Sequence, residues 1–342
     1  MRISRSVLIS LAALSMAGAL PVVAQGAWSV KNTVHIGGDG SWDYVTVDSQ
    51  AHRLFVTRAT HTQVIDEASG KVLGDIAGEV RSHGVALVPA LGRGFITDGG
   101  GSGAIQIFDL KTYAVLGKLA AMPDADGIIY DPSTNLVLAV SGDGGALIPI
   151  KADVDPASGK VEAPIELGGK PEFLAADGTG KVYVNLVDKD LVAVVDLKTR
   201  KVVARWPVAP GGQPTGMAID VKNHRLFIGC RKPAMMIAMS TNDGKIVASL
   251  PIGTGVDATK FDAGLAFASC GDGTMTVVGE KAGKLEVEQV VKTANGARTM
   301  GIDSSTHIAY LPAAEFEAPS PGAPAGRPKM KPDTFMLVEV GK

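Results

Sequence analysis

Acidic side chains recur at one position of a repeated pattern in this sequence. Each lies five residues before a turn position, usually an aspartate, at the point where an apolar segment begins. With 35 Asp and Glu in 342 residues, chance predicts about one acid in seven such positions, whereas four are found. We call these seven positions the acidic column. They hold Asp43, Gly84, Asp126, Glu172, Thr215, Asp257 and Arg298, with His83 beside Gly84.

Asp126 and Glu172 belong to consecutive repeats, and no basic residue stands at the same level in those two repeats. Two carboxylates that face one cavity without a counter-ion repel each other, which raises the proton affinity of one or attracts a cation. Oxygen ligands favour Ca²⁺ or another hard divalent cation, or the amine of a ligand. We therefore expect Asp126 and Glu172 to hold a metal ion or a cationic group, with His83 nearby.

Asp257, Arg298 and Asp43 are expected to form a separate, structural sector. If the repeats close into a ring, Arg298 lies between the two acids, and its guanidinium can bridge both carboxylates through charge-assisted hydrogen bonds. These three residues remain candidates for ligand binding together with Asp126, Glu172 and His83. The alternative is that the column forms the wet mouth of a channel, where solvated carboxylates have no function.

Further polar residues follow the second strand of each repeat and are expected on the same face. Two of the matching strand ends, in neighbouring repeats, carry Cys230 and Cys270. A disulfide between them is compatible with an oxidising compartment, but the outward splay of neighbouring repeats disfavours it. The remaining polar residues of this set are Arg58, His61, Asp98, Asp143, Asn185, Asp188, Arg231 and Asp272.

The common catalytic and cofactor motifs are absent from the chain. It contains no CxxCH, no GxGxxG after a strand, no GxxxxGK[ST], no HExxH and no GxSxG. These absences argue against haem and nucleotide cofactors and against the best-known zinc-protease and α/β-hydrolase signatures. The net charge of −2 gives no electrostatic reason to expect nucleic acid as a partner.

The elements that position the acidic column repeat with it. The turn aspartates are 41 to 46 residues apart when Pro89 is counted at the second turn, and the phrase HRLF occurs at 52–55 and again four units later at 224–227. Each unit contains four short apolar segments, and units of this length with four strands are typical of propeller blades. The repeated aspartate is expected to bond its own turn backbone. The other turn positions are Asp48, Asp131, Asp177, Asp220, Asp262 and Asp303.

Seven turn positions predict an all-β fold, a seven-bladed β-propeller formed by residues 25–342 as one domain. The last unit has only three strands, whereas one unpaired strand, residues 28–36, precedes the first unit. The N-terminal strand is therefore expected to complete the last blade and close the ring, which removes an exposed sheet edge. A proline-rich loop, residues 313–333, is inserted in the seventh blade and is expected to be either a lid or a disordered flap.

The first 24 residues have the pattern of a secretory signal peptide. Arg2 and Arg5 precede an uncharged run, and Val22 and Ala24 fit the small-residue rule for cleavage. We expect a periplasmic or secreted protein, monomeric, with no membrane span in its mature part.

Several phrases of the repeat resemble a known family. RLFVTR at 53–58, KVYVNL at 181–186 and GGQPTGMAID at 211–220 resemble the YVTN-repeat (YncE-like) family of secreted seven-bladed propellers. The resemblance covers nearly the whole chain after the signal peptide and implies that fold. It implies no shared catalytic residues, and the unit containing SHGVALVPAL departs from the phrase.

Three classes of function remain. The first is a non-catalytic binding or scaffold protein whose acidic channel mouth binds a cation, a small molecule or a protein. The second is a metal-assisted hydrolase, lactonase or lyase, since propellers similar to gluconolactonase and streptogramin lyase use carboxylates and histidines at that place; here His61, His83, Asp126 and Glu172 would serve. The third, an electron-transfer partner similar to the heavy subunit of amine dehydrogenase, lacks any haem or quinone signal.

Overall fold

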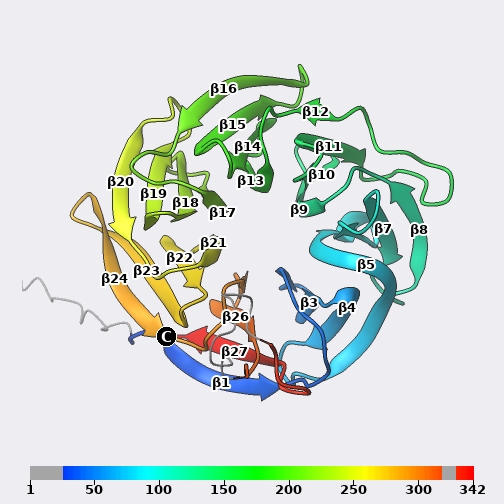
Figure 1. Ribbon diagram of the computed structural model, residues 1–342, viewed down its shortest axis with the longest axis horizontal. Helices are drawn as coiled ribbons and strands as arrows, with labels where there is room; N and C mark the ends of the chain where they lie inside the picture. The colour runs from blue at the N-terminus through cyan, green and yellow to red at the C-terminus, as the bar shows by residue number, and fades with distance from the viewer. Residues whose placement is uncertain (1–25, 318–328) are drawn as a thin grey trace, which may run out of the picture.

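The structure, a computed structural model, describes residues 26–317 and 329–342. The predicted signal peptide and residues 318–328 of the proline-rich loop lie outside this range. The strands of the described residues form six antiparallel sheets, five of four strands and one of seven. Figure 1 shows these sheets arranged in a ring around a common centre.

The seven-stranded sheet comprises seven consecutive strands between Val45 and Ala120. It contains β2 (Val45–Asp48), β3 (Arg53–Thr57), β4 (Ala59–Asp66), β5 (Val72–Val88), β6 (Arg93–Asp98), β7 (Ala104–Asp109) and β8 (Val115–Ala120), with the 3-10 helix η1 (Pro89–Leu91) after β5.

The next two sheets follow in chain order. They contain β9 (Ala125–Asp131), β10 (Leu136–Ser141), β11 (Ala146–Lys151) and β12 (Ile165–Glu166), then β13 (Pro171–Ala176), β14 (Lys181–Leu186), β15 (Leu191–Asp196) and β16 (Lys201–Pro207).

The last three sheets contain the rest of the chain and its N-terminal strand. They comprise β17 (Pro214–Asp220), β18 (Arg225–Arg231), β19 (Ala234–Ser240) and β20 (Ile246–Pro251); β21 (Val256–Asp262), β22 (Leu265–Cys270), β23 (Thr274–Lys281) and β24 (Lys284–Lys292); and β25 (Gly301–Asp303), β26 (Ile308–Ala313), β27 (Met336–Gly341) and β1 (Ser29–His35).

The predicted pairing of the N-terminal strand with the C-terminal segment is confirmed. β1 is hydrogen-bonded to β27 in an antiparallel register that runs from Ser29 opposite Gly341 to His35 opposite Met336. The two ends of the described chain are therefore held in one sheet, and β1 forms its outer strand in Figure 1.

Strand β5 differs from the expected pattern because it continues where a break between repeats was predicted. Its first part pairs with β4, and its last part, from Val85 to Val88, pairs with β6. The segment between them contains no proline that would remove a backbone donor, and Gly78 in this segment adopts the positive φ of 106° that glycine allows, so the strand continues through it. One strand thus joins two groups of four.

Burial follows the position of each strand in its sheet. Strands in the middle, such as β10, are buried along their whole length, because neighbouring sheets cover both faces. Outer strands such as β16 alternate between exposed and partly buried residues, because one face meets solvent. This explains why the middle strands read as continuous apolar runs in the sequence.

The structural interpretation of the turn aspartates is confirmed at most positions. Asp131 accepts hydrogen bonds from the backbone and hydroxyl of Ser133, and Asp303 does the same for Ser305. Asp262 differs, since its carboxylate lies 2.7 Å from Nδ1 of His307. The turn bonds of the other positions are made by Asp48, Asp177 and Asp220.

The described base of the proline-rich loop packs against the rest of the protein. Phe316 and Met330 form an isolated antiparallel bridge, and both pack against the cluster that contains Trp42. The physical reason is the pair of apolar side chains at matching distances from the two ends of the loop. No helix among the described residues is long and apolar enough to span a membrane.

Candidate functional site

The innermost strands bring the acidic column together. In the structure β2, β5, β9, β13, β17, β21 and β25 contact one another in cyclic order, β25 returning to β2. Six of these strands have their column residue at or just before their first residues, whereas in β5 the column residue, Gly84, lies at the start of the part that pairs with β6. Equivalent positions of adjacent strands therefore meet at one end of the central channel. We call this end the acidic mouth; its charged groups are Asp43, His83, Asp126, Glu172, Asp257, Arg298 and Arg231.

Asp43, His83 and Asp126 form the tightest group in the mouth. Nδ1 of His83 lies 2.6 Å from Oδ2 of Asp43 and 3.6 Å from Oδ1 of Asp126. One ligand atom from each residue lies within 4.8 Å of the other two. Oδ1 of Asp126 is buried and has no hydrogen-bond partner among the described residues. The geometry therefore leaves a buried acceptor beside an imidazole and a second carboxylate.

The predicted bridge from Arg298 to both neighbouring acids is not observed. Arg298 Nε donates to Oδ2 of Asp257 at 2.7 Å, but its second contact, at 3.5 Å, is the backbone oxygen of Trp42. The carboxylate of Asp43 is paired with His83 instead. His83 lies on β5, which contacts β2, and its short side chain reaches the Asp43 carboxylate. The predicted structural sector therefore contains Asp257 and Arg298 but not Asp43.

The expectation that Asp126 and Glu172 face the mouth without a counter-ion does not hold for Glu172. Arg231, at the end of β18, is paired with Asp257 and has its Nη2 atom 4.0 Å from Oε1 of Glu172. His83 lies beside Asp126. The long arginine side chain extends from a second strand into the mouth, a reach that alignment of the first strands alone does not reveal.

The mouth nevertheless resists ionisation of its carboxylates. Burial, followed by the charges of Asp43 and Glu172, raises the pKa of Asp126 well above its ordinary value. Burial and the charge of Asp257 raise the pKa of Glu172 to about 7, although Arg231 opposes this. Burial also raises the pKa of Asp257. A bound cation would stabilise the ionised carboxylates in this low-dielectric site.

The residues present fit a divalent metal ion, but with a ligand set that differs from the predicted one. One imidazole nitrogen and two carboxylates suit Zn²⁺, Mn²⁺ or a similar ion better than Ca²⁺, which prefers oxygen ligands only. Glu172 lies outside this group of three.

A second group of a histidine and two acids lies elsewhere in the described residues. His52, Glu67 and Asp303 have ligand atoms within the same 4.8 Å limit. Asp303 is a turn residue whose carboxylate already accepts hydrogen bonds from Ser305 and Thr306. Asp303 is therefore already engaged in its own turn, although both carboxylate oxygens of Glu67 are buried without a hydrogen-bond partner among the described residues, and this group serves as a comparison for the mouth.

Two aromatic rings close the channel behind the mouth, and sequence reasoning missed them. The rings of Tyr44 and Phe173 are in contact at a tilt of 50°, with centroids 5.1 Å apart, and the ammonium of Lys260 lies 5.3 Å from the ring centroid of Phe173. Tyr44 and Phe173 directly follow the column residues Asp43 and Glu172, so a second column, shifted by one position, would have found both rings. We call Tyr44 and Phe173 the aromatic plug.

Other predicted polar residues lie apart from the group of three. His61 Nε2 is 3.6 Å from Oδ1 of Asp75, and burial lowers the pKa of its imidazole. Cys230 and Cys270 are both free and buried, as the splay of neighbouring repeats predicted. Burial raises the pKa of each thiol to about 12, so neither is a reactive thiolate near neutral pH.

Comparison with known proteins identifies the fold but no family. No family model matches the chain, and no curated protein matches it significantly. Among solved structures, Kuenenia stuttgartiensis hydrazine synthase is similar, with a TM-score of 0.67 over 86% of this chain and 96% of that chain. The sequence identity is 11%, so the similarity concerns the fold alone and indicates a β-rich, propeller-like architecture.

Proposed function

We propose that this protein is an exported seven-bladed β-propeller of the YVTN-repeat kind that binds a divalent cation at its acidic mouth. The cyclic contacts of the innermost strands support seven blades, because β2 and β5 contribute separately to that circle although they share one sheet. The signal-peptide pattern of residues 1–24 supports export. The YVTN assignment depends on the sequence phrases alone.

The observation that carries the proposed cation site is the group formed by Asp43, His83 and Asp126. Three potential ligands from β5, β9 and the segment before β2 converge within 4.8 Å, and one carboxylate oxygen is buried without a partner. Unpaired buried acceptors are costly unless a donor or cation satisfies them. A divalent ion would replace the proton shared by His83 Nδ1 and Asp43 and would neutralise Asp126.

Isothermal titration calorimetry of the metal-free protein with Zn²⁺, Mn²⁺ and Ca²⁺ tests this function. We expect one site per chain, with Zn²⁺ or Mn²⁺ bound more tightly than Ca²⁺. The double variant His83→Gln, Asp126→Asn should weaken that binding at least a hundredfold while its circular dichroism spectrum stays unchanged.

The matched control is His52→Gln, which removes the imidazole of the second histidine–acid group without touching the mouth. This variant should bind the metal like the parent. Equal affinity of the parent and the mouth double variant would reject the proposed site.

Glu172 favours a second candidate function, a metal-assisted hydrolase or lyase. Its pKa is about 7, which suits a general base near neutral pH, and it belongs to the same mouth as the proposed metal site. The metal would supply Lewis-acid chemistry, while Glu172 would accept a proton. Screening the metal-loaded protein against lactones, with Glu172→Gln as the control, separates this candidate: activity that needs Glu172 supports an enzyme, and metal binding without turnover supports a binding protein.

A further inference from the structure

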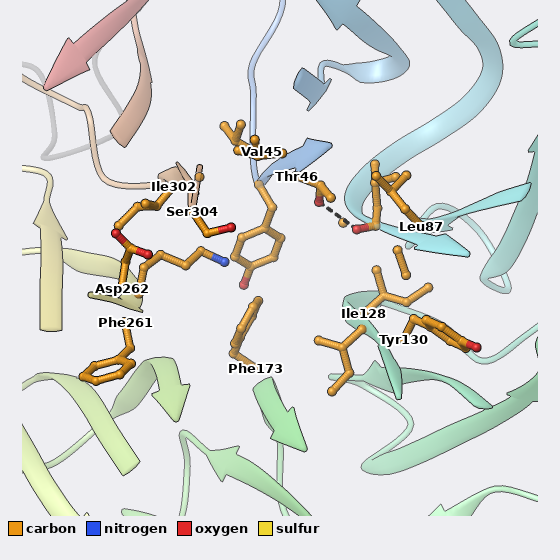
Figure 2. A pocket seen from close by; sticks show the side chains of 18 residues that line it. Val45, Thr46, Leu87, Ile128, Tyr130, Phe173, Phe261, Asp262, Ile302 and Ser304 are labelled. Atoms are coloured by element: carbon orange, nitrogen blue, oxygen red, sulfur yellow. Dashed lines mark hydrogen bonds between the residues drawn. The ribbon is translucent and has the colours of Figure 1, made fainter. Parts of the chain in front are cut away.

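A cavity occupies the channel on the far side of the aromatic plug from the acidic mouth. Its volume is about 430 Å³, within the usual range for small-molecule sites. It is lined by residues from the later part of the innermost strands, beyond the positions of the acidic column. Figure 2 shows Leu87, Ile128, Phe173 and Ile302 around it, so most of its wall is apolar.

Lys260 supplies the one ammonium group among the residues that line this cavity. Among the described residues its Nζ atom has no hydrogen bond and no carboxylate partner, and it lies 5.3 Å from the ring centroid of Phe173. Burial lowers the pKa of this amine to about 8, and no nearby charge opposes the shift. At neutral pH the amine is therefore mostly protonated, and its charge lies in a largely apolar, partly open cavity without a carboxylate partner, which is unfavourable.

The other titratable groups of the cavity leave that cation unpaired. The Asp262 carboxylate is directed to His307, with 2.7 Å between Oδ2 and Nδ1. The Tyr130 hydroxyl donates to Asn135. Burial and neighbouring acids raise the pKa of Tyr44 well above its ordinary value, so its phenol stays neutral and can donate a hydrogen bond. Asp257, beyond the plug, is already paired with Arg231 and Arg298.

We propose that this cavity binds a small organic anion, a monocarboxylate with an aromatic or branched apolar body, whose carboxylate pairs with Lys260. The apolar wall would take the body of the ligand, and the ammonium would take its charge. The Ser304 hydroxyl, which lines the same cavity and is labelled in Figure 2, offers a further donor. A cationic ligand is disfavoured here, whereas the acidic mouth favours one.

The two sites are distinct in position and in charge. Tyr44 and Phe173 line the cavity, and both directly follow acidic residues of the mouth in the sequence. The plug therefore separates a mouth rich in carboxylates from a cavity with an unpaired ammonium. Binding of an organic anion in the cavity does not depend on metal binding at the mouth.

Calorimetric titration with benzoate at pH 7 tests the proposal, with benzamide as a neutral probe of the same shape. We expect saturable binding of benzoate at one site per chain, at least tenfold tighter than binding of benzamide. Lys260→Met, which keeps an apolar side chain of similar length, should weaken benzoate binding at least tenfold and leave benzamide unchanged. Lys260→Arg keeps the positive charge and should retain benzoate binding. This variant tests the proposal if Lys260→Met fails to fold. Affinity of the parent for benzoate should also fall as the pH rises from 7 to 9.5.

Asp126→Asn serves as the control at the mouth and should bind benzoate like the parent. Undiminished benzoate binding by Lys260→Met would overturn the assignment of Lys260. Loss of benzoate binding in Asp126→Asn would overturn its assignment to the cavity. A benzoate concentration of about 20 mM lies far above the dissociation constant expected for a buried charge pair. If the parent protein shows no saturable binding up to this concentration, the proposal itself is overturned.

Discussion

Nδ1 of His83 lies 2.6 Å from Oδ2 of Asp43, although the two residues belong to successive repeats. Nδ1 must carry a proton to donate to this carboxylate, and the same nitrogen must lose the proton to coordinate a metal ion. The pair therefore couples proposed metal binding to proton release.

Metal binding at the mouth should release protons and strengthen as the pH rises from 5 to 7.5. Glu172, with a pKa of about 7, and Asp126, with a raised pKa, should lose protons in the same step because the cation favours their ionised forms. Calorimetry in buffers of different ionisation enthalpy measures the number released, which we expect to be about one or more. Buffer-independent heats would contradict the coupling.

Glu79 should destabilise the protein as it ionises. It is 5% exposed, and burial raises its pKa to about 7, while Thr62 and Gln106 donate to its Oε1 atom. The folded state therefore holds a proton that the unfolded state has lost between pH 4.5 and 7, so stability falls across this window. In the parent protein, ionisation of Glu79 should lower the free energy of unfolding by on the order of 2–3 kcal/mol across this pH range, and Glu79→Gln should abolish that decrease. Urea unfolding at pH 4.5 and pH 8 measures it, and parallel changes in parent and variant would contradict the expectation.

Lys260 should show the opposite pH dependence. Its folded pKa of about 8 lies below the unfolded value near 10.4, so the unfolded state binds the extra proton between these pH values. Stability of the parent should therefore rise relative to Lys260→Met by about 1–3 kcal/mol from pH 7.5 to 10. The comparison with the variant cancels the titration of other groups, such as the buried thiols. A constant difference across this range would show that Lys260 titrates normally.

Phe316 should contribute to stability although it lies in the proline-rich loop. Its ring packs near Trp42, with centroids 6.2 Å apart, and it pairs with Met330 across the base of the loop. Phe316→Ala should cost about 1–3 kcal/mol in urea unfolding, less than a fully buried phenylalanine. Glu317→Ala, in the same segment, removes only an exposed ion pair with Lys329 and should change stability by less than about 0.5 kcal/mol. Equal effects of the two variants would place Phe316 outside the core.

The fold followed from the sequence further than the site did. The strand pattern, the turn bonds of Asp131 and Asp303 and the pairing of β1 with β27 depend on backbone periodicity, which a repeat displays directly. The continuity of β5 could not be predicted from the sequence. Whether one strand ends between two repeats or continues into the next depends on the twist between adjacent groups of strands.

The acidic column showed which residues share a level of the channel, but not which side chains meet. Arg231 reaches Asp257 from a second strand, and His83 reaches Asp43 ahead of Arg298. Both outcomes depend on side-chain length and direction, which the spacing of a repeat does not specify. Lys260 was missed because its importance comes from burial without a partner, a property of the folded channel.

Anomalous diffraction from crystals grown with Mn²⁺ or Zn²⁺ tests the proposed cation site most directly. The account predicts one strong peak at the acidic mouth, roughly 2.0–2.3 Å from Nδ1 of His83 and from one carboxylate oxygen each of Asp43 and Asp126. Crystals of Asp126→Asn, His83→Gln should lack this peak. A mouth without a peak in the parent protein, or a peak at His52, Glu67 and Asp303 alone, would contradict the account.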